Sequence, residues 1–374
     1  MARDHVYIVG AGFSKHAGLP LQKDFTEALL EPRADESHPM RPLVQHLGKF
    51  VHDAFDHGED AKAKFWPNLE DVFTNIDLAA NTGHHLGHIH APSDLRMTRR
   101  VLLARMMRML DERYALAEKH KNTDGKRMDR FFRSLDLKDS AFISINWDTV
   151  IERKLAALPQ VHSVDYCCGA VRAGFPTKGN VVAEHKTPQG ATAVPVVKIH
   201  GSVNWLYCDN CRQLYSFPAE DGLSVAMQLL TRREAKRLEL SDVSKCEKWR
   251  CLTCTAVPLT TRIATFSYLK ALDFPMFERS WLSAERLLRE AKKWIFIGYS
   301  LPAADYEFKH LLKRVQLSRP DSPDFVVITG GTKAVTEAVY RNYQGFFGRG
   351  IRRQENFFRK GLTTEAVAVA QANG

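Results

Sequence analysis

The sequence lacks any hydrophobic run of the kind that crosses a membrane. Its 374 residues are 44% hydrophobic, but no stretch approaches the roughly 20 apolar residues that span a bilayer. Residues 1–5 lead directly into a short apolar run and show no signal-peptide pattern. We therefore expect a cytoplasmic globular protein that has no membrane partner.

Cysteine is scarce, and the number of cysteines is odd. The seven are Cys167, Cys168, Cys208, Cys211, Cys246, Cys251 and Cys254. An odd number in a chain without a targeting signal argues against a disulfide framework.

Charge of one sign is in excess but is not concentrated. The chain has 53 Lys and Arg against 43 Asp and Glu, a formal net charge of +10. Such an excess would suit a polyanion, including a nucleotide or nucleic acid. Because the basic residues are spread along the chain, an ordinary basic surface explains them equally well, and no motif supports nucleic-acid binding.

The most informative stretch is the first twenty residues. Residues 6–9 form a β-branched apolar run that predicts a buried strand, and Gly10, Gly12 and Gly18 follow it. Glycines at the end of such a strand permit a tight turn and a close approach of backbone N–H groups to a phosphate. The spacing departs from the common dinucleotide fingerprint, because Lys15 stands where a third glycine would. The alternative is a tight strand-to-helix turn that binds no ligand.

The next hundred residues predict helices. The apolar spacing indicates a long helix from Ser93, its expected N-cap, to about Lys119. We expect residues 25–136 to form a helical insertion after the first strand. The four histidines within residues 84–90 could bind a metal, but the glycines beside them favour an exposed loop, and the role of the stretch stays open.

Polar residues follow two further predicted strands. Asn146 and Asp148 come after the buried run 141–145, and His200 comes after the run 194–199. In open α/β sheets, ligands bind outside the carboxyl ends of the strands, so these side chains are placed to handle a ligand. For Asn146 and Asp148 the alternative is an Asx turn that caps the next helix. His200 is a candidate for acid–base work, although a lone histidine is usually structural.

The remaining pattern continues the alternation of strand and helix. Runs 294–297 and 325–328 predict strands that end at Gly298 and Thr329, with helices at 303–314 and 334–343. The fold class is therefore α/β, a doubly wound parallel (Rossmann-like) sheet across residues 1–374. Residues 361–374 are rich in small residues and are expected to form a flexible tail.

Two C-x-x-C pairs predict a structural zinc site. Cys208 and Cys211 form one pair, and Cys251 and Cys254 form the other. Four thiolates in this arrangement are typical of tetrahedral Zn²⁺, so residues 207–255 are expected to form a small zinc-binding module. A helix over 223–240 would fill the long spacer. Cys246 is a substitute ligand or, more simply, a reduced bystander.

Taken together, the motifs resemble the sirtuin-like (SIR2-like) family. The segments that carry the resemblance are Gly10–Ser14 with Gly18–Pro20, Ser144–Asp148, Lys198–Gly201, the two C-x-x-C pairs and Gly298–Leu301. The stretches Ile297–Asp305 and Lys198–Trp205 are similar to the branch found in bacterial anti-phage defence.

The resemblance implies NAD⁺ bound across the crevice at the strand ends. Position by position, Asn146 and Asp148 would contact the nicotinamide ribose and carboxamide, and His200 would be the general base. On the pyrophosphate the resemblance would place Gly10, Ala11, Gly12 and Ser14. On the adenosine ribose it would place Gly298 and Ser300. We add Thr329, at the end of the fifth predicted strand, as a further nucleotide contact.

Two departures distinguish the chain from the deacetylases of that family. Deacetylases follow the glycine loop with Asp-Phe-Arg after the proline, but Leu21–Lys23 stands here. They also carry Phe-Gly-Glu after the zinc module, where this chain has Thr261–Thr265. Both absences favour NAD⁺ hydrolysis over protein deacylation, and a catalytically silent nucleotide-sensing subunit is the third alternative. The resemblance also implies gating, by a homo-oligomer or by a partner such as a HerA-type ATPase.

Overall fold

The fold is built on a seven-stranded sheet in which every pairing is parallel. The computed structural model describes residues 3–31, 38–56, 66–176, 179–186, 192–255, 258–261 and 275–372. The sheet order is β11-β10-β9-β1-β2-β6-β3. Its strands are β1 (His5–Val9), β2 (Ser140–Ser144), β3 (Ser163–Asp165), β6 (Ala193–Lys198), β9 (Lys293–Ile297), β10 (Asp324–Ile328) and β11 (Phe357–Phe358).

The central strands are buried on both faces, which is why they read as continuous apolar runs in the sequence. Tyr7 of β1 lies in register between Phe142 of β2 and Ile295 of β9. All five residues of each of these three strands are buried. The predicted doubly wound parallel sheet is confirmed.

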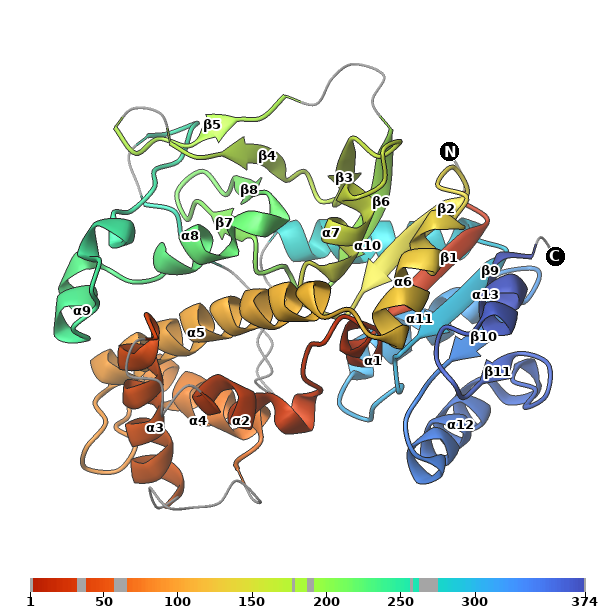
Figure 1. Ribbon diagram of the computed structural model, residues 1–374, viewed down its shortest axis with the longest axis horizontal. Helices are drawn as coiled ribbons and strands as arrows, with labels where there is room; N and C mark the ends of the chain where they lie inside the picture. The colour runs from red at the N-terminus through yellow and green to blue at the C-terminus, as the bar shows by residue number, and fades with distance from the viewer. Residues whose placement is uncertain are drawn as a thin grey trace.

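Helices cover both faces of the sheet (Figure 1). Tyr7 and Val9 face a core that includes Phe131 of α6 (Thr123–Arg133) and Ile151 of α7 (Val150–Ala156). Val6 and Ile8 point to the opposite face. The helices packed there are α10 (Pro275–Glu290), α11 (Tyr306–Ser318) and α12 (Lys333–Phe347).

The strand order places a topological switch point at β1. From β1 the chain proceeds to β2, then β3 and β6 on one side, and returns past β1 to add β9, β10 and β11 on the other. Connections that leave two neighbouring strands in opposite directions open a crevice at their carboxyl ends. The ends of β1 and β9 therefore frame the expected ligand position.

A run of helices separates β1 from β2. They are α1 (Ala11–Lys15), η1 (Gln22–Asp24), α2 (Phe25–Leu30), α3 (Arg41–Phe55), α4 (Leu69–Thr82), α5 (Pro92–Lys119) and α6. Figure 1 shows α2, α3 and α4 gathered against α5 at one side of the molecule, whereas α6 lies on the sheet. The expected N-cap of α5 was wrong by two positions. Ala91 is the N-cap because Pro92 occupies the first turn, where a missing N–H costs nothing, and Ser93 lies inside the helix.

The cysteine-rich region forms a second, four-stranded sheet in the order β5-β4-β8-β7. Its strands are β4 (Val171–Gly174), β5 (Ala183–Glu184), β7 (Trp205–Tyr207) and β8 (Leu214–Ser216). The single helix expected over 223–240 is wrong. The chain instead forms η3 (Ala219–Asp221), α8 (Gly222–Met227), α9 (Arg232–Arg237) and then η4 (Val243–Cys246). Thr231 and Glu234 form a capping box that starts α9 as a new helix.

The flexible tail expected over 361–374 is instead mostly helical up to residue 372, and residues 373–374 lie outside the described residues. Residues 348–350 form the short helix η5, and after β11 the chain ends in α13 (Thr364–Gln371). Thr363 caps α13 by accepting a hydrogen bond from the Ala366 N–H at 3.2 Å. Ala366 and Ala370 are fully buried one turn apart. Their small side chains let the helix approach the sheet closely, so a segment that looked featureless in sequence packs as a narrow stripe.

Candidate functional site

The glycine loop after β1 packs against the loop after β9. The Gly10 N–H donates to Ile297 O at 3.1 Å, and the Gly12 N–H donates to Gly298 O at 2.9 Å. A Cβ atom on Gly298 would lie 2.0 Å from Phe13 N, and Gly298 has a φ of +62°. These glycines are therefore required by backbone packing. The N–H groups of Gly10 and Gly12 already donate to carbonyl groups of the protein. A ligand at this edge would therefore contact other backbone groups, such as those of the exposed Ala11.

Ser14 joins the two polar residues at the end of β2. Its hydroxyl donates to Asp148 Oδ2 at 2.7 Å and accepts from Asn146 Nδ2 at 2.9 Å. Ser14 and Asp148 are buried, whereas Asn146 is partly exposed. The structure thus brings three predicted site residues together, from α1 and from the loop after β2, which lie more than a hundred residues apart in sequence.

Asp148 also makes the Asx turn that was the alternative interpretation. Its second carboxylate oxygen, Oδ1, accepts from the Val150 N–H at 3.0 Å, at the start of α7. Each oxygen of the carboxylate therefore has its own task. Oδ1 accepts a hydrogen bond from the first N–H group of α7, and Oδ2 accepts one from the Ser14 hydroxyl.

His200 lies just beyond the end of β6 and is 8% exposed. Its Nδ1 lies 3.2 Å from Ile145 O, in the loop that carries Asn146. A carbonyl can only accept, so this contact requires a proton on Nδ1, and in the neutral ring the basic lone pair is then on Nε2. His200 is thereby oriented by the same loop that holds Asn146 and Asp148.

The remaining predicted nucleotide contacts lie on the other side of the switch point. Ser300 is exposed beyond β9, and its carbonyl oxygen accepts from Asn342 Nδ2 at 3.1 Å. Thr329 is buried at the end of β10, and its N–H donates to Phe358 O at 2.8 Å. The structure places both at strand ends, on strands separate from the Ser14 cluster.

Sequence reasoning missed two buried charges behind this cluster. Lys198, the last residue of β6, is 0% exposed and forms an ion pair with Glu152 of α7 at 3.4 Å. Burial raises the pKa of Glu152, and the nearby Lys198 ammonium opposes that shift. The available signal was a lysine inside the apolar run 194–199, together with a glutamate one helical turn after Asp148.

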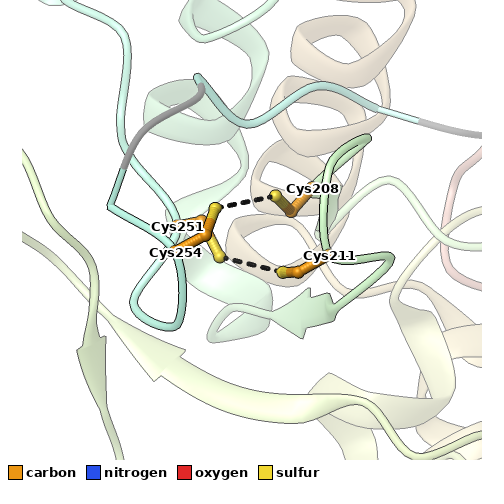
Figure 2. Close-up of side chains that lie close together, drawn as sticks. All are labelled: Cys208, Cys211, Cys251 and Cys254. Carbon is orange, nitrogen blue, oxygen red and sulfur yellow. Dashed lines mark hydrogen bonds between the residues drawn. The ribbon is translucent and has the colours of Figure 1, made fainter.

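The four predicted zinc ligands converge (Figure 2). All four Sγ atoms lie within 4.8 Å of one another, with 3.6 Å between Cys208 and Cys254 and 3.4 Å between Cys211 and Cys251. Sulfur ligands of tetrahedral Zn²⁺, at about 2.3 Å from the metal, lie about 3.8 Å apart. The residues present therefore fit a closed structural zinc site.

The two cysteine pairs share one backbone conformation. The Arg212 N–H donates to Cys208 O and the Thr255 N–H donates to Cys251 O, each at 2.9 Å. Both residues have left-handed φ values, 61° and 52°. This repeated turn points each pair of thiols toward the same centre. Tyr215, whose hydroxyl lies 3.1 Å from Cys251 Sγ, supports the cluster from outside.

Other candidate ligands lie elsewhere. Among the described residues, Cys208, Cys211, Cys251 and Cys254 are the one group arranged to hold a metal ion. Cys246 is buried outside that group, as expected of a bystander. His84, His85 and His88 are exposed in the loop after α4.

Comparison with known proteins gives similarity at the level of solved structures only. No family model matches the chain, and no curated protein matches it. A structure of a Sir2 enzyme, from work on the mechanism and regulation of Sir2 enzymes, is similar with a TM-score of 0.37 and 15% identity, over 99% of this chain and 90% of that one. Sir2 bound to acetylated peptide is similar with a TM-score of 0.32 and 17% identity, over 99% of this chain and 91% of that one. Sir2 with a p53 peptide and NAD⁺ is similar with a TM-score of 0.31 and 17% identity, again over 99% of this chain and 91% of that one.

None of the helices in the described part of the chain combines the length and the apolar character needed to cross a bilayer.

Proposed function

We propose that this protein is an NAD⁺ glycohydrolase that cleaves the bond between nicotinamide and ribose. The products are nicotinamide and ADP-ribose, in linear or cyclic form. The observation that carries the proposal is the convergence of Ser14, Asn146, Asp148 and His200 at the carboxyl ends of β1, β2 and β6. In a doubly wound sheet this edge, beside the switch point, is where nucleotides bind.

The chemistry requires little more than these groups. The nicotinamide ring of NAD⁺ is cationic and leaves as a neutral molecule, so its departure needs no strong general acid. Water then adds to the ribose carbon and loses one proton, which balances the reaction. His200 Nε2 accepts that proton, directly or through a ribose hydroxyl, and Asn146 orients the water. Asp148, fixed by Ser14, holds the carboxamide side of the substrate.

Deacylation of a lysine side chain is the second candidate. It would use the same NAD⁺ site, but nicotinamide release would depend on an acylated peptide. The Asp-Phe-Arg landmark is replaced by Leu21–Lys23, of which Gln22 and Lys23 belong to η1. The second landmark falls at 261–265, and residues 262–265 lie outside the described residues. The sequence departures at both places favour hydrolysis.

Chromatography of the products distinguishes the reactions. The purified chain is incubated with NAD⁺, with and without an acetylated peptide. Hydrolysis predicts nicotinamide and ADP-ribose in both reactions at equal rates. Product that forms only with the peptide, and that appears as O-acyl-ADP-ribose, would establish deacylation instead. Binding of NAD⁺ without turnover by any assembly would favour a nucleotide-sensing subunit.

We further propose that the activity serves bacterial anti-phage defence and is gated by self-assembly or by a partner such as a HerA-type ATPase. The support is the resemblance of Ile297–Asp305 and Lys198–Trp205 to that branch, together with the cost of ungated NAD⁺ loss to a cell. Specific activity should rise steeply with protein concentration or on addition of the partner. Full turnover by a demonstrated monomer would remove the need for gating.

A further inference from the structure

The loop that carries Asn146 and Asp148 is held mainly to the end of β6 and the segment after it, through its backbone carbonyl groups. The ladder between β2 and β6 ends with the pair Ser144 and Lys198. Beyond that pair each carbonyl oxygen of residues 145–148 accepts a hydrogen bond. The donors, in order, are His200 Nδ1 at 3.2 Å, Ser144 Oγ at 3.1 Å, Val203 N at 2.9 Å and the Lys198 ammonium. Three of these four donors come from residues 198–203.

Lys198 provides the fourth of these hydrogen bonds, and its donor is a charged ammonium group. Its side chain is 0% exposed, and its ammonium donates to the carbonyl oxygen of Asp148 while it pairs with Glu152 Oε1 at 3.4 Å. Glu152 in turn accepts from the Tyr166 hydroxyl at 3.2 Å. Asn204 Nδ2, 3.0 Å from that hydroxyl, extends the network toward β8 by donating to Phe217 O at 2.6 Å. A buried charge is tolerated only with such partners.

We propose that Lys198 is a positioning residue that sets the separation between His200 and the Asn146–Asp148 loop. Lys198 is the last residue of β6, two residues before His200, and its ammonium donates to the carbonyl oxygen of Asp148. Because three of the four carbonyls of the loop bind donors from residues 198–203, the side chains of Asn146 and Asp148 are left to face Ser14. Glu152, which accepts from the Tyr166 hydroxyl, pairs with the same ammonium.

A second buried lysine in the same sheet provides a matched control. Lys293, at the opposite end of β9, is 7% exposed and donates to Val369 O and to Ala372 O at 3.2 Å and 2.5 Å. It therefore satisfies backbone carbonyls as Lys198 does, but it lies far from the strand ends that form the site. Substitution of Lys293 reports the cost of losing a buried lysine without disturbing the loop.

The kinetic test rests on the proposed NAD⁺ hydrolysis. Lys198→Met should lower kcat about 10²-fold, as expected when reacting groups shift by about 1 Å, with a much smaller change in KM. Lys293→Met should leave kcat unchanged. The double variant Lys198→Met/Glu152→Leu replaces the ion pair by apolar side chains and should regain thermal stability. If its kcat stays low while its stability recovers, Lys198 acts by positioning. If kcat recovers together with stability, or if Lys198→Met keeps full kcat, the proposal is overturned.

Hydrogen exchange provides a readout that needs no activity. In the double variant, peptides that cover 145–150 and 199–204 should exchange faster than in the wild type, whereas Lys293→Met should leave them unchanged. If the wild type does not cleave NAD⁺, the proposed function is refuted. Faster exchange in the double variant would still support the positioning role of Lys198 in that case. Unchanged exchange in the double variant would refute the positioning role. If Lys198→Met alone fails to fold, the double variant decides both readouts.

Discussion

The Gly12 N–H donates a 2.9 Å hydrogen bond to the carbonyl oxygen of Gly298. This contact joins the loop after β1 to the loop after β9, at the switch point of the sheet. A Cβ atom on Gly12 would lie 2.9 Å from that oxygen. The closeness of the two backbones, and not a ligand alone, therefore demands glycine at both positions.

Gly298→Ala should destabilise the protein strongly. The added methyl group would collide with Phe13 N, and the φ of +62° is strained for alanine. Each effect costs roughly 1–3 kcal/mol, so we expect a clear fall in the free energy of unfolding. Denaturant unfolding measures it. Gly345→Ala is the control, because a methyl group there meets nothing within 4 Å inside α12 and should be neutral or stabilising. Equal effects at both positions would contradict the packing argument.

His200→Ala and Asn146→Ala should each abolish NAD⁺ cleavage. Loss of a general base typically costs about 10²–10⁴-fold in rate, which a product assay detects easily. His200 is 8% exposed, so its variant needs a thermal unfolding measurement alongside the assay. His88→Ala, in an exposed loop, should change neither. Unchanged rates in the first two variants would show that the site is assigned to the wrong residues.

Ser14→Ala should lower activity more than it lowers stability. The hydroxyl is the bridge between Asn146 and Asp148, so both side chains lose their shared partner when it is removed. A buried carboxylate that loses a hydrogen bond also costs about 1–3 kcal/mol. Steady-state kinetics and thermal unfolding measured together check the expectation. A large fall in stability with kcat unchanged would make Ser14 a purely structural residue.

The purified protein should contain one Zn²⁺ per chain. Cys211→Ser should reduce the zinc content and lower the unfolding temperature, because binding of a structural metal contributes directly to folding free energy. Cys246→Ser is the matched control, since Cys246 is buried nearby but outside the four-cysteine group. Metal analysis by mass spectrometry measures the content. Zinc-free wild-type protein, or equal zinc in both variants, would refute the site.

Lys248 should make stability depend on pH in the alkaline range. Burial lowers its pKa from 10.5 to about 8. Between these values the unfolded chain binds more protons than the folded one, so the free energy of unfolding rises as the pH rises from 8 to 10.5. Lys248→Met should lack this rise. Denaturant unfolding at several pH values compares the two proteins, and parallel curves would show that Lys248 titrates normally when folded.

Sequence patterns predicted the central strands and placed the candidate site residues at the ends of those strands. Apolar runs such as 141–145 and 294–297 predicted the central strands, because a strand buried on both faces must be apolar throughout. The two C-x-x-C pairs, by their local spacing, predicted the four cysteines that the structure brings together. Gly10, Asn146 and His200 were correctly placed beyond strand ends, because each follows an apolar run in the sequence directly or within two residues.

Only the tertiary structure decided how these residues meet. The order of strands in the sheet sets which strand ends are neighbours, and no local pattern encodes that order. Ser14 and Asp148 are 134 residues apart in sequence, yet their side chains share a hydrogen bond. The Lys198–Glu152 pair and the contact of Gly12 with Gly298 likewise exist only because β1 lies between β2 and β9 and β6 lies beside β2. The helix at 364–371 depends on the same cause, since its alanines are stable as a helix only where the sheet offers a surface to bury them.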